Sequence, residues 1–478
     1  MLRAALGVKG GATVELYACT IEEMKEKITA AFEKSDDFDT RSFTTRSGKK
    51  VFLAFFSDIT NDDQIRDNVL TPLMEAAEIT DLRDILSTPG LARPATWKEL
   101  IAALSKGDVL VHADGQPPCL LPLTDYKKRP VATTEVENHI YGSHNGFVED
   151  SLTNISLVRK LIRHENLRLK EFELGKGSRT HTALLYLEGY ADPGLVEEAE
   201  RRIKQYRKDH LFSVGELGMV LKDHYYALFP QTLMTERPDN AAHALSQGKV
   251  IIIADNTPYC LVIPVTMMDL LQTSEENGYT VPWNLTFPRV IRFLSMIVGA
   301  VLPALYVALV AFHPELIPTT LTLTIAQSRA QIPFPAPLEA LLMMVALDVL
   351  VEASIRLPSF VGQTIGIVGG LVIGTAAVEA GIVSSTMIIV IAFTAVANFT
   401  MPNWEFSSSW RLIRYGLLLA ASFLGLFGLM LALCLLMIHL CHIKSFHKPF
   451  LSPLTPLNGK ELTDIFFRTK NRDKGEPS

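Results

Sequence analysis

Residues 248–264 read "GKVIIIADNTPYCLVIP", an apolar run, a polar turn and a second apolar run. This pattern predicts two buried strands joined by a tight turn. Residues 107–123, "GDVLVHADGQPPCLLPL", follow the same pattern without a gap. The identical pairs are Gly107/Gly248, Val109/Val250, Ala113/Ala254, Asp114/Asp255, Pro117/Pro258, Cys119/Cys260 and Leu120/Leu261. The chain therefore contains one strand-turn-strand motif twice.

The similarity continues on the N-terminal side of both motifs. Residues 49–75 and 181–205 each contain an apolar run, an acidic turn and an amphipathic helix, and a further helical stretch precedes each motif. This order predicts an α/β domain of two similar, duplicated subdomains, at 1–145 and 146–286.

A polar linker helix over about 145–170 is expected to open the second subdomain. Its acids stand early and its basic residues late, as the helix dipole favours. The basic residues are Arg159, Lys160, Arg163 and Arg168.

Candidate catalytic residues are few in this half of the chain. The stretch "ELGKGSRT", 173–180, lacks the first glycine of a phosphate-binding loop, so a polar turn is the better interpretation. His139 and His144 have no further ligands at metal-binding spacing, and the five cysteines form no CxxC pattern. Asp114 and Asp255 are interpreted as turn residues that bond local backbone N–H groups. We therefore predict no enzyme activity, no metal and no cofactor.

The composition limits the partners and the compartment. The 478 residues carry a net charge of -6, which argues against nucleic acid as a partner. The N-terminal stretch has no apolar core of a signal peptide, so the α/β domain is expected to be cytoplasmic.

The composition changes sharply near residue 287. We predict an α-helical multipass membrane domain over 287–442, with 4–6 membrane segments, and a cytoplasmic tail over 443–478. Residues 293–312 are uncharged and long enough to cross the hydrocarbon core of about 30 Å. Arg289 and Arg292 precede them, which keeps the α/β domain inside by the positive-inside rule.

The remaining apolar runs differ in how clearly they predict a span. Residues 386–401 and 416–441 are apolar, with Arg411 and Arg414 between them as flanking charges. The proline-rich stretch between 313 and 337 is interpreted as an outer loop or an interfacial segment.

Residues 338–358 are apolar but charged along one side. Asp348, Glu352 and Arg356 are spaced i, i+4, i+8, which places them in one stripe of a helix and lets Glu352 pair with Arg356. Two interpretations stay open: an intramembrane charged stripe that faces a partner, or an interfacial helix with its stripe in water.

Residues 360–383, "FVGQTIGIVGGLVIGTAAVEAGIV", have two distinct helix faces. Gly366, Gly370 and Gly374 form a small-residue face that lets another helix pack closely. The opposite face could line a pore in a symmetric oligomer or could meet lipid in a bundle, and its lone acid favours the pore. The pore-lining candidates are Val361, Thr364, Ile365, Val368, Val372, Thr375 and Glu379.

Several linked motifs resemble the A subunit family of GerA-type spore germinant receptors. They are "TEVENHIYGSHNGFVEDSLTNISLVRKLI", "TERPDN", "GKVIIIADNTPYCLVIP", "RLPSFVGQTIGIVGGLVIGTAAVEAGIVS" and "FLSPLTP". The chain differs from the family pattern at "IYGSHNGF", where a basic run is usual, and at Asp255-Asn256, where Asp-Gly is usual. A SpoVAF-like paralogue of the receptor subunit fits the same motifs.

The resemblance implies a multipass subunit of a germinant receptor in the spore inner membrane, in which the permease-like partner senses the nutrient. The expected partners are a permease-like B subunit and a lipoprotein C subunit. The family is thought to form a homo-oligomer, a pentamer, that acts as a nutrient-gated cation channel and triggers germination. The pore helix of the family matches Val361 to Glu379. A non-conducting scaffold subunit and an ion-coupled transporter that uses Asp348 and Glu352 are the alternatives.

Overall fold

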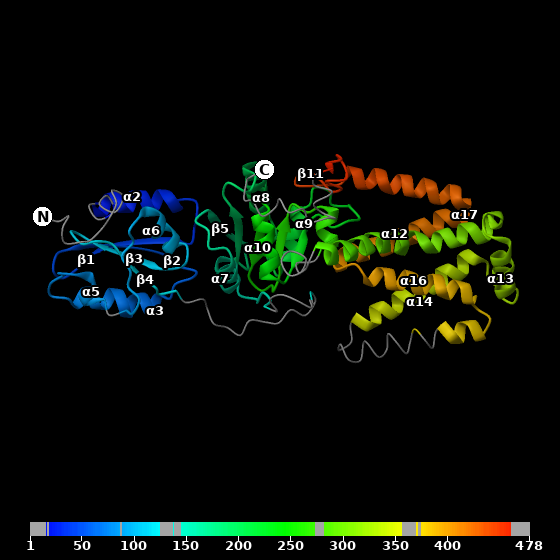
Figure 1. Ribbon diagram of the computed structural model, residues 1–478, viewed down its shortest axis with the longest axis horizontal. Helices are drawn as coiled ribbons and strands as arrows, with labels where there is room; N and C mark the ends of the chain where they lie inside the picture. Colours follow the sequence, from blue (N-terminus) through cyan, green and yellow to red (C-terminus); the bar gives the residue numbers. More distant parts are fainter. Residues whose placement is uncertain are drawn as a thin grey trace. The chain divides into compact units, whose positions relative to one another are not determined.

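A computed structural model describes residues 16, 19–86, 88–124, 137, 145–272, 282–355, 370 and 374–459 (Figure 1). The chain forms two compact units. The first comprises residues up to Lys222 together with Thr232–Pro264. The second comprises Asp223–Gln231 and the chain from Val265 onward.

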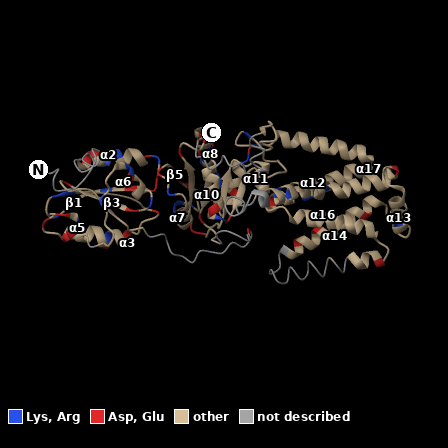
Figure 2. Cartoon of the chain, in the orientation of Figure 1, with Lys and Arg blue, Asp and Glu red and all other residues tan. Residues whose placement is uncertain are grey.

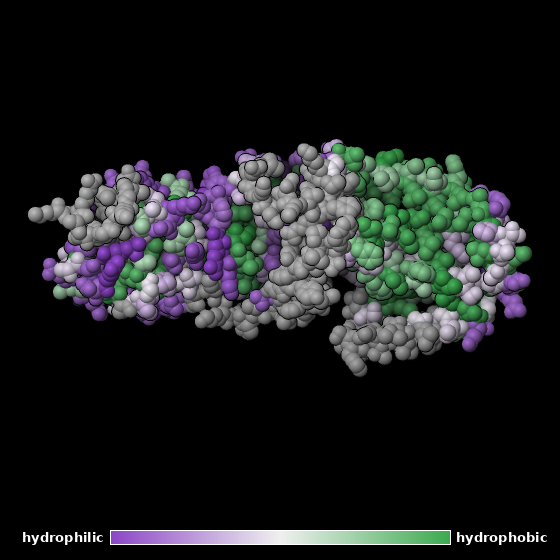
Figure 3. Space-filling view, viewed as in Figure 1, coloured by the Kyte–Doolittle hydropathy of each residue, from purple (hydrophilic) through white to green (hydrophobic). Residues whose placement is uncertain are grey.

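The two units differ in surface chemistry. Figure 2 shows charged residues throughout the first unit and few along the long helices of the second. On the face shown in Figure 3, apolar residues cover most of these helices. Apolar surface of this extent marks a region that another protein or a membrane covers.

The first sheet contains four antiparallel strands in the order β1-β2-β3-β4. The strands are β1 (Phe38–Thr44), β2 (Lys50–Phe56), β3 (Val109–Ala113) and β4 (Cys119–Leu121). Alternate residues of β2 point to opposite faces, so Phe52 and Ala54 join one buried cluster while Val51 and Leu53 join another. The sheet is therefore buried on both faces.

Helices cover both faces of this sheet. Helices α2 (Ile21–Phe32) and α6 (Trp97–Leu104) pack on one face (Figure 1). The other face is covered by α3 (Asp62–Ile65), a π-helical turn (Arg66–Leu70), α4 (Thr71–Glu75) and α5 (Leu82–Ile85).

The second sheet contains five antiparallel strands in the order β5-β6-β8-β9-β7. Its strands are β5 (Leu167–Leu174), β6 (Thr180–Leu187), β7 (Leu233–Thr235), β8 (Val250–Ala254) and β9 (Cys260–Ile263). The two motifs of the sequence form the hairpins β3–β4 and β8–β9, so this prediction is confirmed. The hairpins hold corresponding places in their sheets, although duplication itself remains a prediction.

The turns of the two hairpins share a backbone conformation. Gly115 in the first and Asn256 in the second occupy equivalent positions and have φ of +73° and +64°. Asparagine is one of the few residues that adopt the left-handed region readily. Asn256 can therefore stand where glycine would be usual.

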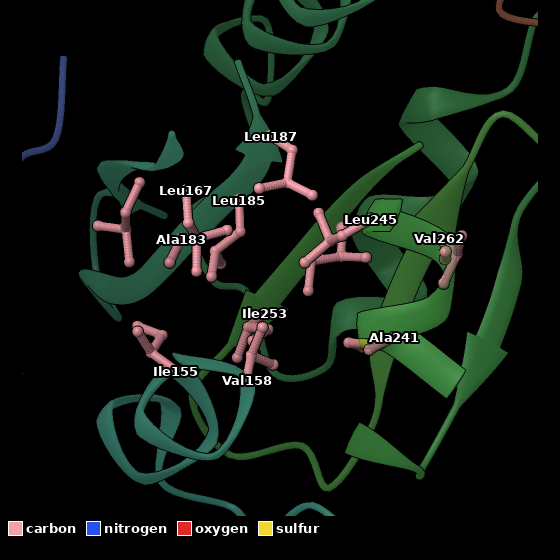
Figure 4. Close-up of a cluster of buried hydrophobic side chains, with 14 of the residues drawn as sticks. Ile155, Val158, Leu167, Ala183, Leu185, Leu187, Ala241, Leu245, Ile253 and Val262 are labelled. Carbon is pink, nitrogen blue, oxygen red and sulfur yellow. The ribbon is translucent and has the colours of Figure 1, made fainter. Parts of the chain in front are cut away.

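The helices of the second sheet lie on both of its faces. Helices α7 (Ser151–Leu161) and α10 (Pro238–Ser246) enclose a core of aliphatic side chains with the sheet (Figure 4). Helices α8 (Pro193–Lys204) and α9 (Val214–Leu221) pack against each other, and α9 also contacts β8 and β9.

The predicted extent of the linker helix, about 145–170, is wrong. The helix ends at Leu161, and Arg168 lies on strand β5. Residues 167–174, "LRLKEFEL", alternate apolar and polar side chains in two short runs, 167–170 and 171–174, the period of a half-buried strand. Helix α7 buries Ile155 and Val158 against the second sheet, so it packs as part of that subdomain.

The second unit is mainly helical. It contains α11 (Met267–Leu271), α12 (Pro282–Phe312), a 3₁₀ turn (Pro314–Leu316), α13 (Thr319–Arg329), α14 (Ala336–Ile355), helical residues 374–379, α16 (Ser385–Phe399) and α17 (Trp404–His442). Strands β10 (Lys444–Ser445) and β11 (Lys448–Pro449) follow. The stretch expected to be an outer loop thus contains α13, which at 11 residues is too short to span a bilayer.

Within the described residues, two helical stretches are long and apolar enough to cross a membrane, Thr286–Phe312 and Trp404–His442, by length and composition only, and the second is interrupted at Gly425. The number of crossings remains a prediction.

Helix α17 is two helices that reverse direction at Gly425. Gly425 has φ +60° and ψ -140°, which is not helical. The ring of Trp410 lies 5.4 Å from Phe229, and the ring of His442 lies 5.1 Å from His224 in the same short loop. A straight helix would separate residues 410 and 442 by about 48 Å. The apolar run 416–441, predicted as one segment, is therefore divided between the two arms of a hairpin.

Candidate functional site in the helical unit

A buried ion pair joins α14 to the first arm of α17. Asp348 accepts two hydrogen bonds from Nη2 of Arg414, at 3.1 and 3.3 Å. The hydroxyl of Tyr415 donates to the same carboxylate at 2.5 Å. The Arg414 side chain is 0% exposed, whereas that of Asp348 is 23% exposed. The pair brings together residues that are 66 positions apart in the sequence.

The guanidinium of Arg414 depends on this single carboxylate. Among the described residues, its Nε and Nη1 atoms are buried without a hydrogen-bond partner. A buried charge is strongly unfavourable unless it is paired. Asp348 therefore neutralises a charge that the bundle could not otherwise hold.

The sequence did not predict this pair. It placed Asp348, Glu352 and Arg356 in one stripe and treated Arg414 as a flanking charge. Glu352 is exposed, and Arg356 lies outside the described residues. Arg414 is fully buried, so its interpretation as a flanking charge is wrong. One signal was available, since Arg414 is the only charged residue in "LIRYGLLLAASFLGLFGLM".

A second buried carboxylate anchors the start of α16. Glu339 on α14 is fully buried and accepts from the backbone N–H of Ser384 at 2.6 Å and from its hydroxyl. Ser384 is the N-cap of α16, and the guanidinium of Arg329 lies 3.6 Å from the same carboxylate. A negative charge at a helix N-terminus is stabilising. Glu339 thus joins α13, α14 and α16.

The predicted pore and packing residues lie mostly outside the described residues. Those outside are Val361, Thr364, Ile365, Gly366, Val368 and Val372. Thr375 and Glu379 are described, exposed and one helical turn apart. A Cβ atom added at Gly374 would lie 4.0 Å from Cγ2 of Ile388, so this side of the helix faces α16. At Gly370 an added Cβ would meet no atom within 4 Å.

The first unit contains a polar array of serine, histidine and glutamate. The Ser151 hydroxyl lies 2.8 Å from Nδ1 of His181, and Nε2 of His181 lies 3.4 Å from Glu171. The Glu171 carboxylate raises the pKa of His181. Ser151 is fully buried. The array joins α7 to strands β5 and β6.

Asp255, the turn aspartate of the second motif, bonds a residue that is distant in the sequence. Asp255 accepts from the backbone N–H of Ser151 at 2.9 Å. The sequence predicted a hydrogen bond from a backbone N–H of the same turn. The carboxylate instead accepts from a residue 104 positions away. Asp255 and the N-cap Asp150 together place negative charge at the start of α7.

A second buried ion pair joins α7 to the first sheet. Arg159 pairs with Asp37, and both side chains are nearly inaccessible. The guanidinium also lies over the ring of Phe56, 4.4 Å from its centroid. Burial and the neighbouring Asp37 raise the pKa of Asp58 to about 7. Two carboxylates, one just before β1 and one just after β2, therefore lie beside one arginine.

Stability of the first unit is expected to fall with rising pH because of Asp58. In the unfolded chain this group ionises near pH 4, whereas in the folded chain it keeps its proton to about pH 7. The contribution of Asp58 to the free energy of unfolding is therefore largest below pH 4. It falls by roughly 2–4 kcal/mol as the pH rises through 7. Asp58→Asn should remove this loss.

Unfolding in urea exposes the buried Cys119 thiol, which a short pulse of a thiol reagent then labels. The urea concentration at half-maximal labelling, compared between pH 5 and pH 8, measures this effect. Asp84→Asn, an exposed acid, is the matched control. An equal pH dependence in wild type and Asp58→Asn would contradict the expectation.

The fold and these sites define a class of protein in which an N-terminal α/β domain precedes apolar helices that hold buried ion pairs. The family described as Bacillus/Clostridium GerA spore germination protein has a model that matches residues 26–476. The chain belongs to this family.

Known relatives span nearly the whole chain. The "Uncharacterized membrane protein YfkQ" of Bacillus subtilis is 36% identical over 94% of this chain and 88% of its own length. The "Spore germination protein GerLA" of Bacillus cereus is 34% identical over 96% of this chain and 94% of its own.

A crystal structure of the N-terminal domain of the A subunit of the Bacillus megaterium spore germinant receptor GerK3 is 24% identical, with a TM-score of 0.40. The match covers 51% of this chain and 94% of that one.

Proposed function

We propose that this chain is the A-type subunit of a spore germinant receptor and forms a nutrient-gated cation channel as a homo-oligomer. Relatives along the whole chain are named spore germination proteins, among them GerLA and GerQA. The channel would lie in the spore inner membrane, with the α/β domain in the cytoplasm. Family membership supports the receptor role, and the helical unit supports the channel.

The observation that carries the channel is the exposed acid Glu379. It follows Thr375 by one turn on a helix whose Gly374 side faces α16. An acid on a membrane helix is costly unless it faces water or a partner. A water-filled pore around the axis of an oligomer, a pentamer by family resemblance, supplies such an environment, and a ring of acids attracts cations.

The ion pair between Asp348 and Arg414 favours a role in helix packing over a role in ion-coupled transport. A carboxylate relay would need Asp348 and Glu352 to share one pathway. Asp348 instead binds Arg414 and Tyr415, which hold α14 against α17. We therefore assign this cluster to the stability of the bundle.

The partners follow from the family. We propose a permease-like B subunit and a lipoprotein C subunit as the other components of the receptor, with the B subunit binding the nutrient. The A-type subunit would then convert nutrient binding into ion flow.

Replacing the acid at the end of the proposed pore should reduce cation selectivity. We expect Glu379→Gln to lower the ratio of cation to anion permeability roughly tenfold, because the ring loses its charge. Ion flux through the full chain reconstituted in liposomes measures this ratio. Glu315→Gln removes an exposed acid from the turn after α12 and is the matched control.

The same proteoliposomes test whether the valines of the proposed pore helix form a narrow apolar ring that limits ion flow. Val372→Ser should increase the resting flux, because a hydroxyl lets water enter a narrow apolar ring. Unchanged selectivity in Glu379→Gln together with unchanged flux in Val372→Ser would rule out this helix as the pore.

A further inference from the structure

A short loop of the second unit presents two exposed tyrosines on a rigid support. In residues 223–231, Tyr225 and Tyr226 are 63% and 90% exposed, and the centroids of their rings lie 5.1 Å apart, edge to face. The buried Gln231 side chain accepts from the N–H of Asp223 at 2.7 Å and donates to the carbonyl of His224 at 3.0 Å. The loop is thus closed by its own hydrogen bonds.

An aromatic cluster anchors this loop to the helices. Phe229 is buried, and its ring lies 5.8 Å from Phe406, 5.4 Å from Trp410 and 5.7 Å from Phe450. The tyrosines are therefore exposed, while Phe229 fixes the C-terminal end of the loop to the helices.

The hairpin β10–β11 braces the loop from the C-terminal side. Ser445 donates from its hydroxyl to the carbonyl of Gln231 at 2.7 Å, and the N–H of His447 donates to Asp223 at 3.2 Å. Phe446 and His447 form the turn with φ of +48° and +65°, a conformation that non-glycine residues adopt at a cost. Positive φ at both central residues is the geometry of a type I′ turn, which closes a two-residue hairpin.

We call residues 223–231 and 444–449 together the aromatic–lysine platform. Lys444 and Lys448 are exposed on its hairpin. Asp223 is the one acidic residue in these two stretches, and it accepts the hydrogen bond from His447. The platform is therefore cationic and aromatic.

The platform lies where an apolar helix ends. The second arm of α17 exposes Phe427, Met430 and Ile438 along its length. The side chains then become polar or cationic from His442 onward, and the His442 ring lies 5.1 Å from His224. Tyrosines and lysines at the end of an apolar helix are typical of the boundary between hydrocarbon and headgroups.

We propose that the aromatic–lysine platform binds the headgroups of anionic phospholipids, with Lys444 and Lys448 at the phosphates and Tyr225 and Tyr226 in the interface. This inference rests on the proposed membrane function. Each lysine near an anionic surface strengthens binding about fivefold. The platform would anchor the end of α17 to the leaflet on its own side.

Binding of headgroups is tested on the purified full chain. Native mass spectrometry with phosphatidylglycerol and phosphatidylcholine in competition measures the preference for the anionic lipid. Lys444→Gln with Lys448→Gln should reduce that preference at least about tenfold. Lys25→Gln with Lys98→Gln removes two exposed charges from the first unit and should leave it unchanged. An unchanged preference in the platform variant would overturn the inference.

The position of the tyrosines is tested by a spin label. Tyr226→Cys is labelled in a chain with Cys434→Ser and Cys441→Ser, because these two thiols are exposed. In phosphatidylglycerol vesicles, the label should collide more with oxygen and less with a water-soluble nickel complex than a label at Lys98→Cys. Equal access of the nickel complex to both labels would overturn the lipid contact and indicate a protein partner.

Neither measurement depends on ion flow. A chain that inserts into vesicles but shows no headgroup preference contradicts only this inference. A chain that does not insert into vesicles contradicts the proposed function as well.

Discussion

Asp348→Asn should strongly destabilise the helical unit. The substitution leaves Arg414 as a buried charge whose Nε and Nη1 already have no partner among the described residues. Removing one member of a buried ion pair typically costs about 3–5 kcal/mol. For a unit of this size we expect the midpoint of thermal unfolding in detergent to fall by about 10 °C.

The double variant Asp348→Leu with Arg414→Met distinguishes the charge from the packing. Apolar replacement of a buried pair is often neutral or stabilising, so the double variant should recover most of the loss. Tyr415→Phe removes one hydrogen bond to the carboxylate and should cost only about 1 kcal/mol. If Asp348→Asn unfolds at the wild-type temperature, Arg414 has a different counter-ion.

Gly425→Ala should open the hairpin of α17. At φ +60° and ψ -140° a residue with a Cβ atom is strained, by about 1–3 kcal/mol. The new Cβ would also lie 2.9 Å from Cβ of Phe312, closer than such atoms approach. Both effects favour a continuous helix, which would carry Cys441 about 24 Å beyond the turn.

Labelling of Cys441 by an impermeant maleimide in oriented proteoliposomes measures this change. In wild type, Cys441 should react from the same side as Tyr226→Cys, because His442 contacts the loop that contains Tyr226. Gly425→Ala should reduce or reverse that sidedness. Gly416→Ala is the control, since its added Cβ meets no atom within 4 Å and alanine favours a helix. Identical labelling in both variants would refute the role of Gly425.

Local patterns predicted much of the α/β domain correctly. The two motifs form β3–β4 and β8–β9, and Cys119 and Cys260 are buried in them. "ELGKGSRT" is the turn between β5 and β6. These features depend on side-chain alternation and turn residues, which act over a few positions.

Errors arose where one local pattern adjoined another. Apolar and basic residues near 160–170 fit a helix, yet the period changes from helix to strand after Leu161. The run 416–441 is apolar throughout, so its composition gave no sign of a reversal. Only the backbone at Gly425 and its contact with Phe312 reveal the hairpin.

Composition and periodicity were enough to recognise the strand-turn-strand motifs and the apolar C-terminal half, and the resemblance of several linked motifs indicated the family. These properties are carried by neighbouring residues or by whole segments, so they can be read without coordinates. The partner of Arg414, the link from Asp255 to α7 and the joining of the 223–231 loop to β10–β11 depended on the folded chain. Each unites residues more than 60 positions apart, and a charge or a hydrogen-bonding group in a sequence does not specify which distant group folding will place beside it.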